Sequence, residues 1–281
     1  MGPSFKQSWN FHHGAIMRLS TALLTLVAIA FPVSAQDYSL KQLNVSPRHH
    51  EWVAIHVDGR DVYCFIAYPE NAKNSSVAIV IHENRGLTDW VRSFADQLAG
   101  AGYLAVAPDL LSGFDAEHSR TGDFKNPDDA RSALYNLDPN QITRDLLAVR
   151  KYASQIPSSN GKTVVIGFCW GGSQAFRFAT DSKDISAALV FYGSSPDSGE
   201  IRNITAPVYG FYAGNDERIN ATIAETKELM TKHGKRYEFE VYQGAGHAFM
   251  RSGDDPEGSV ENRKARDDSW VRMKRILSQI K

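Results

Sequence analysis

The sequence predicts an α/β fold in which helices cover both faces of a mostly parallel central sheet. Short runs rich in β-branched residues alternate with longer amphipathic stretches, as they do when helices connect parallel strands. Some of the short runs, such as Val77–Ile81, are apolar at every position, which is typical of strands buried on both faces. The predicted strands are Trp52–Val57, Val62–Tyr68, Val77–His82, Leu104–Ala107, Thr163–Gly167, Ala187–Tyr192, Val208–Ala213 and Glu238–Tyr242. The predicted helices are Trp90–Ala99, Gln141–Gln155, Ser173–Thr180, Ile219–His233 and Glu261–Ile280.

The first two predicted strands are separated only by Asp58-Gly59-Arg60-Asp61, which is a hairpin signal. We therefore expect the sheet to start antiparallel and to continue parallel. The segment Leu110–Asn140 is polar and has no clear periodicity, so we expect an irregular cap over a site. No linker or repeat follows Gln36, and residues 36–281 are expected to form a single domain.

The first 35 residues have the pattern of a secretory signal peptide. Arg18 precedes a largely apolar run, Ala22–Val33, and the small residues Ser34 and Ala35 follow it. The run is too short to cross about 30 Å of hydrocarbon, so cleavage near Ala35 would leave no stable membrane anchor. This predicts an exported protein, periplasmic or secreted, whose translation starts at Met17. A membrane anchor or a buried N-terminal helix is the alternative.

The charges are balanced and scattered along the chain. With 31 Lys and Arg against 32 Asp and Glu, the sequence has no basic stripe for nucleic acid. No spacing of His and Cys matches a metal site, and no cofactor is expected. We expect a monomer that acts on a small molecule.

The two cysteines, Cys64 and Cys169, could form a disulfide in an exported protein. However, Cys64 lies within a predicted strand, whereas Cys169 lies in a glycine-rich turn. The sequence therefore favours two free thiols with different roles.

That turn, Gly167–Gly172 (GFCWGG), follows a predicted strand and precedes a predicted helix. It matches the G-x-nucleophile-x-G elbow, in which a strained turn exposes the nucleophile and small residues let helix and strand approach each other. The start of a helix also stabilises an anionic thiolate. The alternative is a glycine-rich turn around an inert cysteine.

Asp216 and His247 each follow the end of a predicted strand, so with Cys169 they should meet at one edge of the sheet. The order nucleophile, acid, base is that of α/β-hydrolases. Cys169 would attack a carbonyl, His247 would transfer the proton and Asp216 would orient the imidazole. Glu217 is the nearest competitor for the acid. The loop after Ile81 would supply one oxyanion N–H from Asn84, and the residue after the nucleophile, Trp170, would supply the other.

Taken together, the motifs resemble the dienelactone hydrolase (carboxymethylenebutenolidase) family. The resemblance rests on a Glu in the oxyanion loop (Glu83), the GFCWGG elbow, Asp216, and His247 followed by Phe249 and Arg251. It covers about Glu51–Ile280. It implies that Glu83 pairs with the resting thiol and helps to deprotonate Cys169.

The resemblance also implies that arginines bind a substrate carboxylate. Arg251 matches the second family arginine, and Arg131 with Tyr135 repeats the Arg-x-x-x-Tyr spacing of the first, with Arg144 as its rival. Tyr192 matches a family aromatic residue near the nucleophile. Ala248 departs from the family pattern, in which serine is common.

The expected function is thus hydrolysis of small esters or lactones. Three alternatives stay open: an exported esterase or acyl hydrolase of broader specificity, a non-catalytic binding protein with this fold, and a redox protein that uses Cys169.

Overall fold

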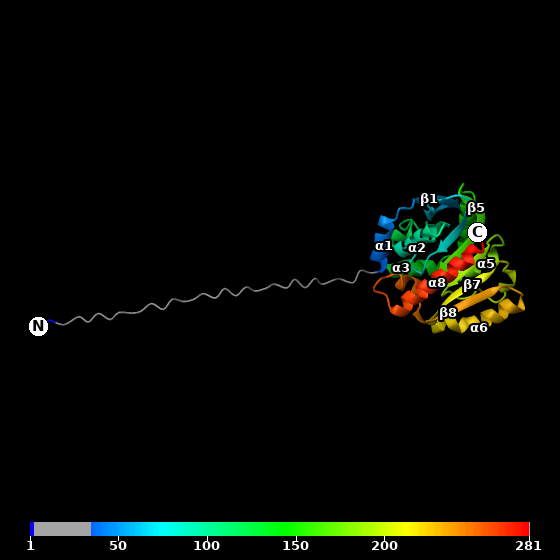
Figure 1. The fold of residues 1–281 in the computed structure, drawn as a ribbon. Coiled ribbons are helices and arrows are strands. Elements are labelled where there is room, and N and C mark those ends of the chain that lie inside the picture. Colours follow the sequence, from blue (N-terminus) through cyan, green and yellow to red (C-terminus); the bar gives the residue numbers. More distant parts are fainter. Residues whose placement is uncertain (3–34, 281) are drawn as a thin grey trace. The chain divides into compact units, whose positions relative to one another are not determined.

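The computed structural model describes residues 1–2 and 35–280 of the chain, and residues 35–280 form an eight-stranded sheet with helices on both faces (Figure 1). This confirms the predicted α/β-hydrolase fold. The predicted signal peptide lies, apart from residues 1, 2 and 35, outside the described residues. The strands are β1 (His50–Val57), β2 (Arg60–Ala67), β3 (Ser75–Ile81), β4 (Leu104–Pro108), β5 (Ser159–Phe168), β6 (Ala187–Phe191), β7 (Val208–Asn215) and β8 (Tyr237–Gly246). The helices are α1 (Ala35–Val45), α2 (Asp89–Gly100), α3 (Pro127–Tyr135), α4 (Pro139–Ser154), α5 (Trp170–Asp181), α6 (Glu217–Lys232), α7 (Phe249–Ser252) and α8 (Val260–Ser278), with 3₁₀ turns at η1 (Thr121–Asp123) and η2 (Ile201–Asn203).

The strand order is β1-β2-β4-β3-β5-β6-β7-β8, with β1–β2 and β2–β4 antiparallel and the remaining pairs parallel. The opening hairpin is tighter than its sequence suggested. Val57 pairs directly with Arg60, and the two residues between them, Asp58 and Gly59, have φ values of 50° and 81°. Two residues with positive φ make the turn that matches the twist of antiparallel strands.

Strand β3 shows why an uninterrupted apolar run is needed at the centre of the sheet. Ala78 and Val80 pack into a core under α2 and α8, whereas Val77, Ile79 and Ile81 pack into a second core under α4 and α5. Successive side chains of a strand point to opposite faces, so each face of β3 meets its own layer of helices. The sheet therefore separates two apolar cores.

The expectation of an irregular cap was wrong for part of the segment 110–140. This segment contains η1 and α3, and α3 begins with a well-formed cap. The Asn126 side chain accepts a hydrogen bond from the backbone N–H of Asp128, and Pro127 takes the first helical position, where its missing N–H costs nothing.

The two cysteines are free, as the sequence favoured. Cys64 is fully buried in the core, and burial raises the pKa of its thiol. Within residues 35–280 no helix combines the length and apolar character needed to span a bilayer.

Candidate active site

Cys169 lies at the sharp turn between β5 and α5. Its backbone has φ 55° and ψ −117°, a strained conformation for a residue with a side chain. The flanking glycines are required by close backbone contacts. A Cβ atom on Gly171 would collide with the carbonyl oxygen of His82, and one on Gly167 would collide with the carbonyl of Gly171. The turn therefore has the geometry of a nucleophile elbow.

Asp216 and His247 follow the ends of the neighbouring strands β7 and β8. Asp216 Oδ2 lies 2.5 Å from Nδ1 of His247, and the carboxylate is buried. Glu217, the competing acid, is exposed at the start of α6. The carboxylate that orients the imidazole is therefore that of Asp216.

Cys169 lines the same cavity as His247 and Asp216, so the three predicted side chains lie together. Burial alone would lower the pKa of His247. The hydrogen bonds and charges of Cys169 and Asp216 outweigh burial and raise the pKa of His247 to about 9. The imidazole therefore holds its proton at neutral pH, next to the sulfur.

Glu83 follows β3 and is almost fully buried, and its carboxylate binds Arg251 rather than the thiol. The distance from Arg251 Nε to Glu83 Oε2 is 2.7 Å. This differs from the pairing of Glu83 with Cys169 that the family resemblance implied. The physical reason is that a guanidinium neutralises a buried carboxylate, while Cys169 has His247 as its partner.

Tyr192 is fully buried, and its ring packs against the His247 ring with 5.0 Å between centroids. Burial, together with the nearby charge of Glu83, holds the pKa of Tyr192 well above its usual value. The side chain is therefore a neutral phenol that packs against the His247 imidazole.

The backbone N–H groups of Asn84 and Trp170 were predicted to bind an oxyanion, and each of these residues lines a cavity that Cys169 also lines. Among the described residues neither donates to a backbone or side-chain acceptor, and Trp170 is the first residue of α5, where no intrahelical acceptor exists. The sequence analysis missed the residue that holds this loop, His82. Its Nδ1 lies 2.8 Å from the Glu83 carbonyl oxygen, its Nε2 accepts from Leu110 N–H at 3.2 Å, and its ring stacks on Trp170.

Two cavities meet at Cys169. One, of about 360 Å³, is polar and contains Glu83, Asn84, Asp216, His247 and Arg251. The other, of about 300 Å³, lies under α3 and α4. Cys169, Tyr135 and Arg218 line both cavities, so a substrate at the sulfur can extend in two directions.

The structure brings Tyr135 to these cavities but not the arginines predicted beside it. Arg131 forms an ion pair with Asp128 at 3.3 Å, and Arg144 forms one with Asp58 at 2.5 Å. Neither arginine lines either cavity. Both arginines are exposed and pair with surface carboxylates, Arg131 within its own helix α3 and Arg144 with the β1–β2 turn.

Arg218, which the sequence analysis did not consider, lies at the entrance instead. It is in the first turn of α6, and no ion pair joins it to a carboxylate within residues 35–280. The sequence did indicate that Arg218 lies near the site, because it follows Asp216 by two residues.

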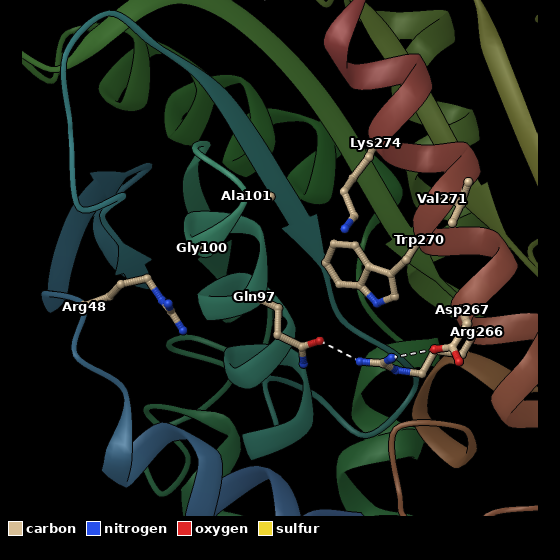
Figure 2. A pocket seen from close by; sticks show the side chains of 9 residues that line it. All are labelled: Arg48, Gln97, Gly100, Ala101, Arg266, Asp267, Trp270, Val271 and Lys274. Atoms are coloured by element: carbon tan, nitrogen blue, oxygen red, sulfur yellow. Dashed lines mark hydrogen bonds and ion pairs between the residues drawn. The ribbon is translucent and has the colours of Figure 1, made fainter.

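A third cavity, of about 560 Å³, lies between α2 and α8 and lacks this chemistry (Figure 2). Arg266 binds Gln97 and Asp267, as Figure 2 shows. Arg48 binds Asp96, and Lys274 Nζ lies 5.9 Å from the centroid of the Trp270 ring. No nucleophile lies next to a base among its lining residues.

Comparison with known proteins shows which proteins this chain is similar to. A model of the "Dienelactone hydrolase family" matches residues 62–281. A provisionally named carboxymethylenebutenolidase of Saccharolobus solfataricus is 30% identical over 260 residues, covering 79% of this chain and 96% of the relative. A provisionally named 2-oxo-3-(5-oxofuran-2-ylidene)propanoate lactonase of Bradyrhizobium sp is 27% identical, covering 71% of this chain and 83% of the relative. A crystal structure of a provisionally assigned dienelactone hydrolase from Klebsiella pneumoniae superposes with a TM-score of 0.70 and 24% identity, covering 80% and 96% of the two chains.

Proposed function

This chain belongs to the dienelactone hydrolase family and is a hydrolase of small-molecule lactones or esters, and we propose that it works through Cys169, His247 and Asp216. The observation that carries the proposal is the position of His247. Its Nδ1 lies 2.5 Å from Asp216, and the ring lines the same cavity as Cys169. A nucleophile, a base and a group that orients the base are thus grouped at one cavity.

In the first half of the reaction the Cys169 sulfur attacks the carbonyl carbon of the substrate. The C=O electrons move to oxygen, and the N–H groups of Asn84 and Trp170 stabilise the oxyanion. When the tetrahedral intermediate collapses, the C–O bond to the leaving group breaks and His247 gives its proton to the departing oxygen. The acyl group remains as a thioester on Cys169.

In the second half the neutral imidazole of His247 takes a proton from water, and the hydroxide attacks the thioester carbonyl. Collapse of this second intermediate releases the carboxylic acid and returns the sulfur to its resting state. Asp216 keeps the ring of His247 in one orientation throughout.

We further propose that the substrate carries a carboxylate bound by Arg251 and Arg218. The Arg218 guanidinium has no carboxylate partner in the described part of the chain, and its planar fork suits a carboxylate. The name of the Bradyrhizobium relative specifies a propanoate lactone, which is an anionic substrate of this kind.

The redox alternative is disfavoured by the burial of Cys64. A peroxide or disulfide sensor needs a resolving cysteine that Cys169 can reach, and the Cys64 side chain is 0% exposed within a strand.

Export remains a proposal that rests on the pattern of residues 1–35. N-terminal sequencing of the protein recovered from the periplasm or medium should give Gln36 as the first residue. A chain that keeps residues 17–35 would contradict it. A monomer is likewise proposed, and sedimentation equilibrium of the processed protein tests it.

The enzymatic proposal is tested by assaying the processed protein on 4-nitrophenyl acetate and on dienelactone. Cys169→Ala should abolish turnover and Cys169→Ser should lower it strongly, whereas Cys64→Ala serves as the matched cysteine control. Undiminished hydrolysis by Cys169→Ala would show that another residue is the nucleophile.

A further inference from the structure

The cavity under α3 and α4 differs in character from the polar one that contains His247. Its walls include Leu134, Leu137, Ile142 and Ile219, and Cys169 also lines it. We call it the apolar cavity. Such a cavity offers apolar contact to any substituent that enters it from the sulfur.

Ser173, Ser194 and Gln174, which line this cavity, already have partners, whereas Arg218, which lines both cavities, pairs with no carboxylate in the described part of the chain. The Ser173 and Ser194 hydroxyl oxygens are 3.0 Å apart, and the backbone N–H of Ser194 donates to Ser173 Oγ at 2.9 Å. Gln174 Oε1 accepts from Arg177 Nε at 3.0 Å. A polar substituent would have to compete with these bonds, whereas a hydrocarbon substituent would not.

The position of His247 decides which part of the substrate enters this cavity. His247 lines the polar cavity together with Asp216 and is absent from the lining of the apolar one. The leaving-group oxygen must lie near His247 to receive its proton, so the leaving group occupies the polar cavity. The acyl group, on the other side of the carbonyl carbon, is then directed into the apolar cavity.

We infer that the apolar cavity is an acyl-binding pocket, and that the substrates are esters or substituted lactones whose acyl part carries a hydrocarbon group. The inference rests on the roles proposed for Cys169 and His247. A methylene has about the volume of a water molecule, roughly 30 Å³, so a cavity of about 300 Å³ accepts no more than about ten of them. An acyl chain of medium length therefore fits, and a long fatty acyl chain does not.

The test is a series of 4-nitrophenyl esters from acetate through butanoate and hexanoate to dodecanoate, with a constant leaving group. For the unmodified enzyme we expect kcat/KM to rise by up to about fourfold for each methylene that enters the pocket, and to stop rising at about eight to ten carbons. A profile that is highest with acetate and falls steadily would overturn the inference.

Two variants of Leu137, which is half-buried in the pocket wall, shift the profile in opposite directions. Leu137→Trp should lower the ratio of hexanoate to acetate kcat/KM by about tenfold or more, and Leu137→Ala should move the optimum to longer chains. Leu147→Trp is the matched control, because Leu147 is exposed on α4 and lines neither cavity. Equal ratios in Leu137→Trp and Leu147→Trp would contradict the assignment. If Cys169→Ala is inactive while the Leu137 variants leave the profile unchanged, the pocket assignment fails and the proposed function stands.

Discussion

Arg251 and Glu83 are 168 positions apart in the sequence and form an ion pair at the edge of the active site, with 2.7 Å between Nε and Oε2. The pair joins the loop after β3, which contains Asn84, to α7, which begins two residues after His247. Glu83 is the more buried partner, with 7% of its side chain exposed against 31% for Arg251. The negative charge of the buried Glu83 carboxylate is therefore balanced by the Arg251 guanidinium.

We predict that Arg251→Ala destabilises the protein by about 2–3 kcal/mol, because it leaves the Glu83 carboxylate buried without a countercharge. The loss is at the low end of the range for buried pairs, since Arg251 is partly exposed. Urea unfolding measures it. The double variant Glu83→Gln/Arg251→Ala should recover part of the loss, and Arg131→Ala, at an exposed pair, should change stability by less than about 0.5 kcal/mol. Equal stability of Arg251→Ala and the unmodified protein would contradict the account.

The proton on His247 gives a second prediction. Its pKa is raised to about 9, partly by the hydrogen bond and charge of Cys169. Acid catalysis requires the protonated ring, so kcat/KM should fall as the pH rises through about 9. In Cys169→Ser the hydroxyl carries no charge, and the descending limb of the residual activity should move to lower pH. An identical limb in both enzymes would contradict the contact between sulfur and imidazole.

A third prediction concerns His82, whose pKa is lowered by burial. The unfolded chain takes up a proton near pH 6.5, whereas the folded His82 takes it up only at lower pH. Stability should therefore fall as the pH drops below about 6.5, by up to about 1.4 kcal/mol per pH unit from this residue. His82→Phe keeps a ring against Trp170 but lacks the titration, so the stability difference between the two proteins should shrink between pH 7 and pH 5. A constant difference would argue against a neutral buried imidazole.

The elbow gives a fourth prediction. Gly171→Ala places a methyl group against the carbonyl oxygen of His82 and should cost about 2 kcal/mol or more, with loss of activity. Gly199→Ala is the control, because a Cβ atom there meets nothing within 4 Å. Thermal unfolding compares the two. A Gly171→Ala variant as stable and active as Gly199→Ala would mean that the close approach of β3 and α5 is not required.

The central strands β3, β4 and β6 could be predicted because burial on two faces leaves an uninterrupted apolar run, as in Val77–Ile81. The edge strands β1 and β8 are partly exposed and mix apolar with polar residues. Helix α3 was missed because most of its residues are polar and its apolar periodicity is weak, although Asn126 and Pro127 carried a usable start signal. A helix made mostly of polar residues, such as α3, is therefore harder to predict from sequence than a strand buried on both faces.

The triad could be predicted because each of its members ends a strand of a parallel sheet, so that chain order fixes their common edge. The partners of the arginines could not. Whether an arginine reaches the cavities depends on which carboxylates lie near it in the folded chain. These come from a distant segment, as Asp58 does for Arg144, or from the preceding turn of the same helix, as Asp128 does for Arg131. The pairing of Glu83 with Arg251 rather than with Cys169 could not be predicted for the same reason, because the two residues are 168 positions apart in the sequence.

The central claim, that Cys169 is the nucleophile, is tested most directly by titration with iodoacetamide followed by peptide mapping. Cys64 is fully buried and serves as an internal control within the same folded molecule. We predict that one carbamidomethyl group enters at Cys169, that Cys64 stays unmodified, and that activity falls in proportion to the modified fraction of Cys169. Full activity in protein whose Cys169 is completely modified would contradict the account.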